Sequence, residues 1–182
     1  MKTIYKKVEE SEITLTELML PSHSNFSGKI HGGFILSLMD KAAFSAGAKF
    51  SGHYCVTASV NRVDFLSPIE VGELVTLRAR VNYVGNTSMV VGIRVESQNI
   101  RTGEVKHCNS SYFTMIAKDE KGKTAPVPGL IIEDIDQMRR FLRSIKHIEN
   151  RRERKDAYSS KNFIPENYKD ILKDYKVKLE VE

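Results

Sequence analysis

The sequence predicts an α+β domain in which a curved antiparallel sheet wraps around one long central helix. The first observation is an apolar stretch of helical length that runs from about Gly33 to Phe50. The second is a change to period-two alternation from Tyr54 onward, which is typical of strands with one face turned inward. The third is that short turns join the last three of these strands, which favours an antiparallel meander.

One strand precedes the helix, at residues 11–20, where Ile13 and Leu15 alternate with polar neighbours until Pro21 ends the pattern. A polar loop follows, and the helix then weakens at Gly47 and Gly52. Turn residues separate the strands that come after the helix. These four strands are expected at residues 55–65, 74–84, 89–98 and 104–117.

The C-terminal part of the chain predicts an amphipathic helix, because residues 131–148 repeat apolar side chains at a three-to-four spacing. Residues 139–155 hold eight Lys or Arg and two Glu, so the net charge of +5 is concentrated there. We therefore expect an α+β domain at 8–130 and a helical, basic extension at 131–182. A solvated helix packed on an oligomer explains this extension better than nucleic-acid binding, because aromatic residues do not interleave with its charges.

Several protein classes are excluded by composition. No apolar run approaches the ~20 residues that a membrane span needs, and no hydrophobic stretch follows the first lysines as a signal peptide would require. Cys55 and Cys108 are expected to be free thiols, and neither has a partner at metal-ligand spacing. The sequence predicts a cytoplasmic protein without a membrane segment or a metal site.

Asp40 is the first candidate for chemistry, because it is the one carboxylate in a helix that is apolar almost all round. Such a helix is expected to be buried on every side, where an unpaired carboxylate is costly unless it has a partner, a raised pKa or a function. Asp40 is a candidate general base or nucleophile in a largely apolar pocket. The alternative is a core aspartate that is hydrogen-bonded to Ser37 or to a neighbouring strand.

Gly32 and Gly33 at the start of this helix support a functional reading. Free N–H groups and the positive end of the helix dipole form a site for a developing oxyanion, although glycine also serves ordinary turns. His31 and Asn25 lie in the preceding loop. A lone histidine is more often structural than catalytic, and a turn residue explains Asn25 as well as a functional role does. Thr57, on the first strand after the helix, could orient a water molecule or simply fill a strand position.

A second candidate binding segment joins two predicted strands. Its residues offer backbone and hydroxyl donors that could hold a phosphate, and an ordinary hairpin turn explains them as well. They are Gly85, Asn86, Thr87 and Ser88.

The candidate residues form a pattern that resembles a known family. The pattern N-x-x-G-x-x-H-G-G-x-x-x-x-x-x-D, from Asn25 to Asp40, resembles the active-site segment of hot-dog-fold acyl-CoA thioesterases. Residues 59–73, 84–89 and 111–128 are similar to the subgroup of brain acyl-CoA hydrolase and its single-domain bacterial relatives. The resemblance is collinear over residues 8–130, although His31 stands where several members of that subgroup have Phe.

The resemblance implies an active site between two subunits. The family's catalytic aspartate falls on Asp40 and its catalytic asparagine on Asn25, facing each other across the interface. The backbone donor that polarises the thioester carbonyl falls on Gly33, and the strand threonine falls on Thr57. His31, Gly32 and the 85–88 turn are implied to contact the substrate, with the turn near the CoA nucleotide.

The resemblance also implies the assembly. A sheet that covers its helix on one side leaves the other side to a second copy of the chain, and members of the family look like hexamers built as trimers of dimers. They need no metal and no cofactor besides the CoA of the substrate. The expected activity is hydrolysis of acyl-CoA to free acid and CoA. The alternative is a non-catalytic acyl-CoA-binding sensor on the same scaffold.

Overall fold

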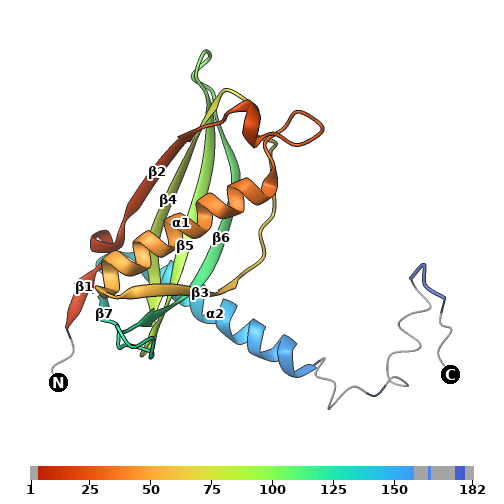
Figure 1. The fold of residues 1–182 in the computed structure, drawn as a ribbon. Helices are drawn as coiled ribbons and strands as arrows, with labels where there is room; N and C mark the ends of the chain where they lie inside the picture. The colour runs from red at the N-terminus through yellow and green to blue at the C-terminus, as the bar shows by residue number, and fades with distance from the viewer. Residues whose placement is uncertain (1–3, 158–163, 165–174, 179–182) are drawn as a thin grey trace. The chain divides into compact units, whose positions relative to one another are not determined.

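A computed structural model describes residues 4–157, 164 and 175–178 (Figure 1). Residues 1–145 form one compact unit and residues 146–182 a second; the predicted boundary at residue 130 stays a prediction. The elements in chain order are β1 (Tyr5–Lys7), η1 (Val8–Ser11), β2 (Ile13–Leu18), η2 (Pro21–His23), α1 (Gly32–Ser51), β3 (Tyr54–Val60), β4 (Glu73–Val84), β5 (Ser88–Asn99), β6 (Val105–Lys118), β7 (Gly129–Ile131) and α2 (Ile135–Ala157).

Five strands form one antiparallel sheet in the order β2-β4-β5-β6-β3. Helix α1 lies across one face of this sheet (Figure 1), so the predicted fold class, a curved sheet around one long helix, is confirmed. The short strands β1 and β7 form a separate parallel pair, which the sequence analysis did not predict. The predicted strand at 55–65 is too long, because β3 ends at Val60 and the chain then leaves the sheet.

The sheet curves because three of its strands carry one extra residue each. The pairing register shifts at Ala58 on β3, at Asn82 on β4 and at Cys108 on β6. An unpaired extra residue bends its strand and increases the local twist. These three bulges let a five-stranded sheet curl around a single helix.

Helix α1 is buried on one face only, which corrects the expectation that it is buried on every side. Its buried residues include Ala42, Ala43, Ala46 and Gly47, whose small side chains let the sheet approach closely. The opposite face, with Gly33, Ser37, Asp40, Lys41 and Phe44, is exposed in the single chain. Phe44 is the large apolar side chain of α1 that the single chain leaves exposed on this face.

Helix α2 is the predicted amphipathic helix. Its first turn is capped by Asp134, whose Oδ1 accepts a hydrogen bond of 2.7 Å from the Gln137 N–H. Asp136 accepts hydrogen bonds from Arg139 and Arg140, which lower the pKa of this carboxyl to about 2. Farther along, Phe141 packs on Tyr83 of β4 with ring centroids 5.1 Å apart. The part of the predicted extension at 158–163, 165–174 and 179–182 lies outside the described residues.

The bulge at Asn82 places a side chain against Gly92 of β5, where there is no room for a Cβ. A Cβ at Gly92 would collide with the buried Asn82 Nδ2. We expect Gly92→Ala to lower the free energy of unfolding by about 1–3 kcal/mol, because the inserted methyl displaces a packed side chain. Urea denaturation of both proteins measures this difference.

Gly47→Ala is the matched control for Gly92→Ala. A Cβ at Gly47 meets its nearest neighbours at 3.5 Å, an ordinary contact distance. Alanine also has the higher helix propensity, so this variant is expected to be as stable as the parent or more so. If Gly92→Ala were as stable as the parent, the expected collision between a Cβ at position 92 and the Asn82 side chain would be contradicted.

Candidate active site

The site is centred on a hydrogen bond between α1 and β3. Thr57 Oγ1 donates to Asp40 Oδ1 at 2.5 Å, and Met115 Sδ lies 3.5 Å from the same hydroxyl. Asp40 lies two turns into the helix, and Thr57 stands on the strand that follows it, directly before the bulge at Ala58. The Thr57 hydroxyl therefore orients the carboxylate. Two hydrogen-bond partners were predicted for a structural Asp40, namely Ser37 and a neighbouring strand. The observed partner, Thr57, belongs to the strand.

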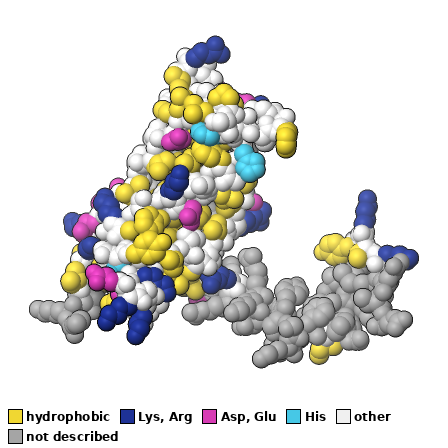
Figure 2. All heavy atoms as spheres, in the orientation of Figure 1, with side chains coloured by type: hydrophobic (Ala, Val, Ile, Leu, Met, Phe, Trp, Pro, Cys, Tyr) yellow, Lys and Arg dark blue, Asp and Glu magenta, His cyan; other side chains and the backbone are white. Residues whose placement is uncertain are grey.

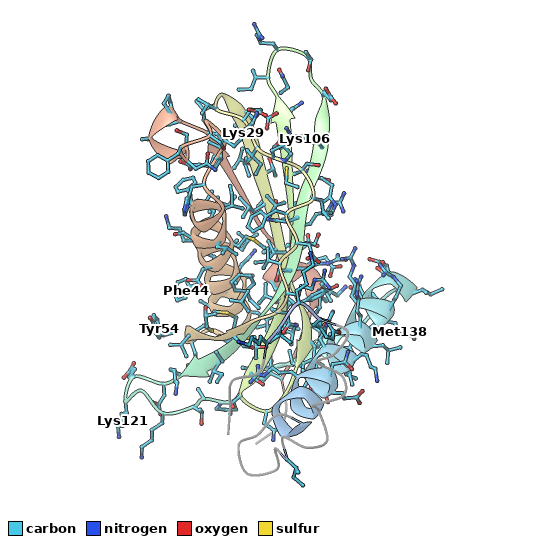
Figure 3. The ribbon with its side chains drawn as sticks, turned by 90° about the vertical axis from the view of Figure 1, so that its right-hand side faces the viewer. Lys29, Phe44, Tyr54, Lys106, Lys121 and Met138 are labelled. Carbon is cyan, nitrogen blue, oxygen red and sulfur yellow. The ribbon has the colours of Figure 1, made fainter. Side chains whose placement is uncertain are left out.

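A hollow of about 410 Å³ opens beside this pair. Its walls come from α1 (Asp40, Lys41, Phe44, Ser45) and from β3 (Tyr54, Cys55, Val56, Thr57). The Phe44 and Tyr54 rings lie 5.5 Å apart (Figure 3) and remain substantially exposed. Hydrophobic side chains gather at the surface over α1 and β3 (Figure 2). Asp40 thus lines an open, mostly apolar hollow in the single chain, where the sequence predicted a largely apolar pocket.

Phe44 and Tyr54 belong to the site but were not among the residues predicted from the sequence. Phe44 lies one turn after Asp40 on the exposed face, and Tyr54 is the first residue of β3. The available signal was the spacing of Asp40 and Phe44, which places both on one helix face. Tyr54 gave no comparable signal, since it lies next to Phe44 only through the turn between α1 and β3.

The start of α1 supplies free backbone donors. The first recorded helical bonds run from the Phe34 and Ile35 N–H groups to the His31 carbonyl, at 3.0 and 3.4 Å, so the Gly32 and Gly33 N–H groups precede the hydrogen-bonded turns. The space that a Cβ would fill at Gly33 is taken by the His31 ring, with Cε1 2.6 Å from that position. At Gly32 the nearest atom is on the Phe65 ring, at 3.2 Å. A side chain at Gly33 would displace the His31 ring, and one at Gly32 would require the Phe65 ring to shift by a few tenths of an ångström.

The Asn25 side chain organises its own loop. Asn25 Oδ1 accepts hydrogen bonds from Ser27 N, Ser27 Oγ and Lys29 N, at 3.0, 2.8 and 3.2 Å. The loop is anchored to the helix by His23, which stacks on Phe34 with ring centroids 3.8 Å apart. The Asn25 residue is exposed, and its oxygen is engaged within the loop. The Nδ2 group is therefore the part of the side chain that can serve another molecule.

The predicted phosphate-binding turn is ordered by backbone hydrogen bonds. Gly85 N donates to Ser88 O at 2.8 Å, while Asn86 O and Thr87 O accept from Val127 N and Ala117 N at 3.0 Å each. None of these four turn residues lines the hollow beside Asp40. Phosphate binding at this turn stays a prediction.

The described part of the chain has neither a cluster of metal-ligating side chains nor a membrane-spanning helix. Among these residues no group of three or more His, Cys, Asp or Glu side chains is arranged to hold a metal ion. No helix within the described ranges is long and apolar enough to cross a membrane. Cys55 and Cys108 are free thiols, as predicted; both are buried, and burial raises the pKa of each thiol.

The sequence matches a family model described as the thioesterase superfamily over residues 27–104. Protein VdlD of Helicobacter pylori is 41% identical over 143 residues, which cover 79% of this chain and 82% of that protein. The uncharacterized acyl-CoA thioester hydrolase YkhA of Bacillus subtilis is 31% identical over 147 residues, with 81% and 86% covered.

Solved structures that resemble this chain are also acyl-CoA thioesterases or hydrolases. An apo-hexameric acyl-CoA thioesterase superposes with a TM-score of 0.80 at 37% identity, covering 83% of this chain and 97% of the other. An acyl-CoA hydrolase from Staphylococcus aureus, solved in complex with butyryl-CoA and CoA, superposes with a TM-score of 0.78 at 29% identity, with 84% and 93% covered. The curled sheet and its helix are the hot-dog fold.

The Staphylococcus aureus hydrolase has also been solved with alanine in place of one asparagine, one aspartate or one threonine. In that protein the aspartate follows the asparagine by 15 residues, and the threonine follows the aspartate by 17 residues. The separations from Asn25 to Asp40 and from Asp40 to Thr57 are the same.

Proposed function

Because this chain belongs to the acyl-CoA thioester hydrolase family, we propose that it hydrolyses acyl-CoA thioesters to a free carboxylic acid and CoA. The observation that carries the proposal is the 2.5 Å hydrogen bond from Thr57 Oγ1 to Asp40 Oδ1 at the rim of the apolar hollow. The hollow suits an acyl chain, and the carboxylate stands where the thioester group would enter. The equal spacing of asparagine, aspartate and threonine in the Staphylococcus aureus hydrolase supports the choice of Asn25, Asp40 and Thr57.

Two subunits are needed to complete the proposed site. Gly33 and Asp40 lie on one face of α1 but seven residues apart, which is about 10 Å along a helix axis. A carbonyl oxygen that accepts a hydrogen bond from Gly33 N–H then lies far outside the roughly 3–3.5 Å that direct attack by the same chain's Asp40 requires. A second copy whose α1 runs antiparallel brings the partner subunit's Asp40 beside Gly33. Two equivalent sites result.

The exposed face of α1 supports this assembly. Self-complementary pairing about a two-fold axis places the same patch on both subunits and covers Ser37, Asp40 and Phe44, which one chain leaves exposed. The related thioesterase described as hexameric is 37% identical. We infer a homo-oligomer of such dimers, with the trimer of dimers as its arrangement.

Each residue then has a role in hydrolysis. The Gly33 N–H stabilises the negative charge that develops on the thioester oxygen, with His31 and Gly32 shaping the loop around it. Asp40 takes a proton from water as the water oxygen bonds to the acyl carbon, or attacks that carbon directly to give a mixed anhydride that water then hydrolyses to the free acid and the restored carboxylate. The carbon–sulfur bond breaks, and the departing CoA thiolate takes up a proton. Thr57 orients the carboxylate, and the Asn25 amide from the other subunit orients the water or the carbonyl.

The remaining contacts concern the CoA part of the substrate. The turn of Gly85, Asn86, Thr87 and Ser88 is proposed to contact the CoA nucleotide. No step of this mechanism calls for a metal ion or a separate cofactor, and the proposed location is the cytoplasm.

Release of free thiol from a series of acyl-CoAs, from acetyl to palmitoyl, tests the proposed function. We expect turnover with at least one chain length. Tight binding of acyl-CoA without thiol release would contradict hydrolysis and favour the non-catalytic sensor instead.

A further inference from the structure

The loop before α1 carries an apolar side chain that no other group in the described chain covers. Phe26 stands at the loop tip, next to Asn25, and its side chain is fully exposed. Burial of a phenylalanine side chain changes an equilibrium constant by about ten- to more than a hundredfold. A phenylalanine held in water therefore lacks a favourable contact that a second molecule can provide.

This loop is held in one conformation. Asn25 N donates to Lys29 O at 2.7 Å, Gly28 N donates to Asn25 O at 3.0 Å, and Gly28 adopts φ +78°. The three hydrogen bonds to Asn25 Oδ1 add to these. A loop already ordered in the free chain loses little conformational freedom when it docks. Phe26 is thus presented for contact on a rigid support.

The exposed hollow on the same chain has apolar walls that suit a phenylalanine side chain. Phe44, Tyr54 and Val56 give it apolar walls. The hollow flanks the second half of α1, whereas the Phe26 loop precedes the helix. In Figure 3, Phe44 and Tyr54 lie toward one end of α1 and Lys29, on the Phe26 loop, lies toward the other. Phe26 therefore lies away from the hollow of its own chain.

The antiparallel pairing brings the loop and the hollow together. If Gly33 faces the partner subunit's Asp40, the two-fold axis passes beside residues 36–37 of each α1, midway along the helix between positions 33 and 40. Phe44 lies one turn beyond Asp40, so the partner's segment one turn before Gly33 lies opposite it. That segment is the end of the loop that carries Phe26.

We propose that Phe26 of each subunit enters the hollow formed by Phe44, Tyr54 and Val56 of a second copy of this chain, and there sets the length of acyl chain that the site accepts. This inference rests on the proposed two-subunit thioesterase site. The phenyl ring occupies the volume into which the far end of a long acyl chain would extend. A smaller side chain at this position leaves that volume to the substrate.

Acyl-chain selectivity is the first test. Each added methylene that finds apolar cover improves kcat/KM about fourfold, so Phe26→Ala is expected to raise the ratio of kcat/KM for octanoyl-CoA over butyryl-CoA at least tenfold. Phe26→Trp is expected to lower that ratio. An unchanged ratio in both variants, at the parent's oligomeric state, would overturn the inference.

Fluorescence gives a test that does not depend on activity. The chain contains no Trp, so Phe26→Trp provides a single reporter in the full-length oligomer. Ile100→Trp, at an exposed position in the β5–β6 turn, is the matched control. We expect blue-shifted emission from position 26, altered further by acyl-CoA, and water-exposed emission from position 100.

The two tests separate the possible failures. A buried Trp at position 26 in a protein that releases no thiol would contradict the proposed function but not the docking of the loop. Water-exposed emission from both positions, in an active oligomer, would overturn the docking and leave the thioesterase intact.

Discussion

Replacement of Asp40 by asparagine is expected to reduce kcat for acyl-CoA hydrolysis by about 10²–10⁴-fold, which is the usual contribution of a general base. An amide of nearly the same shape keeps an oxygen that accepts the hydrogen bond from Thr57 Oγ1 but cannot take up a proton or attack a carbonyl. The side chain is exposed in the single chain, so the fold is expected to persist. Steady-state thiol release, with circular dichroism as a check on folding, measures the effect.

Glu120→Gln is the matched control for Asp40→Asn. Glu120 is an exposed carboxylate in the turn after β6, and its neutralisation changes the net charge by the same amount. Near-normal turnover is expected from this control. Near-normal turnover from Asp40→Asn, with the oligomer intact, would contradict the assignment of Asp40.

Thr57→Val is the second change expected to have a large effect. Valine keeps the shape and the β-branching of threonine but removes the hydroxyl that holds Asp40 Oδ1. A hydrogen bond to a charged group contributes roughly 1.5–3 kcal/mol. Turnover is therefore expected to fall roughly ten- to a hundredfold, with a smaller change in KM because the hollow keeps its walls.

Thr57→Ser separates the hydroxyl from the methyl group. Serine restores the donor without the branch, and most of the lost turnover is expected to return. If Thr57→Val and Thr57→Ser reduce turnover equally, the claim that the reaction depends on the hydrogen bond from position 57 to Asp40 is contradicted.

The periodicity of apolar residues was enough to predict the long helix and strands of the fold. Helix α1 and strands β4 to β6 are long, so their apolar repeats are sampled over several turns or pleats. Strands β1 and β7 have three residues each and give no measurable period. The bulges at Ala58, Asn82 and Cys108 were not predicted, because an extra residue in a ladder is defined by the strand that pairs with it.

The candidate site was predictable to the extent that it depends on one helix and the strand after it. Asp40 and Thr57 belong to consecutive elements, and the structure joins them directly. The apolar pattern of α1 predicted a helix buried on every side, whereas the single chain buries one face, because a sequence pattern does not report which molecule covers a surface. The relation between Asn25 and Asp40 lies outside any single-chain pattern for the same reason.

The central claim is that each active site takes Asn25 from one subunit and Asp40 from the other, and mixed oligomers test it most directly. Asn25→Asp keeps an oxygen for the loop hydrogen bonds of Asn25 Oδ1 but removes the amide donor. Chains with Asn25→Asp and chains with Asp40→Asn, each nearly inactive alone, are co-expressed in equal amounts under different tags and purified on both.

If the sites are shared, a dimer that contains one chain of each kind has one site with both native residues. Random pairing is then expected to restore about a quarter of the parent's activity. If each site is built within one chain, no chain has both residues. Activity at the level of the two single variants would then contradict the shared site.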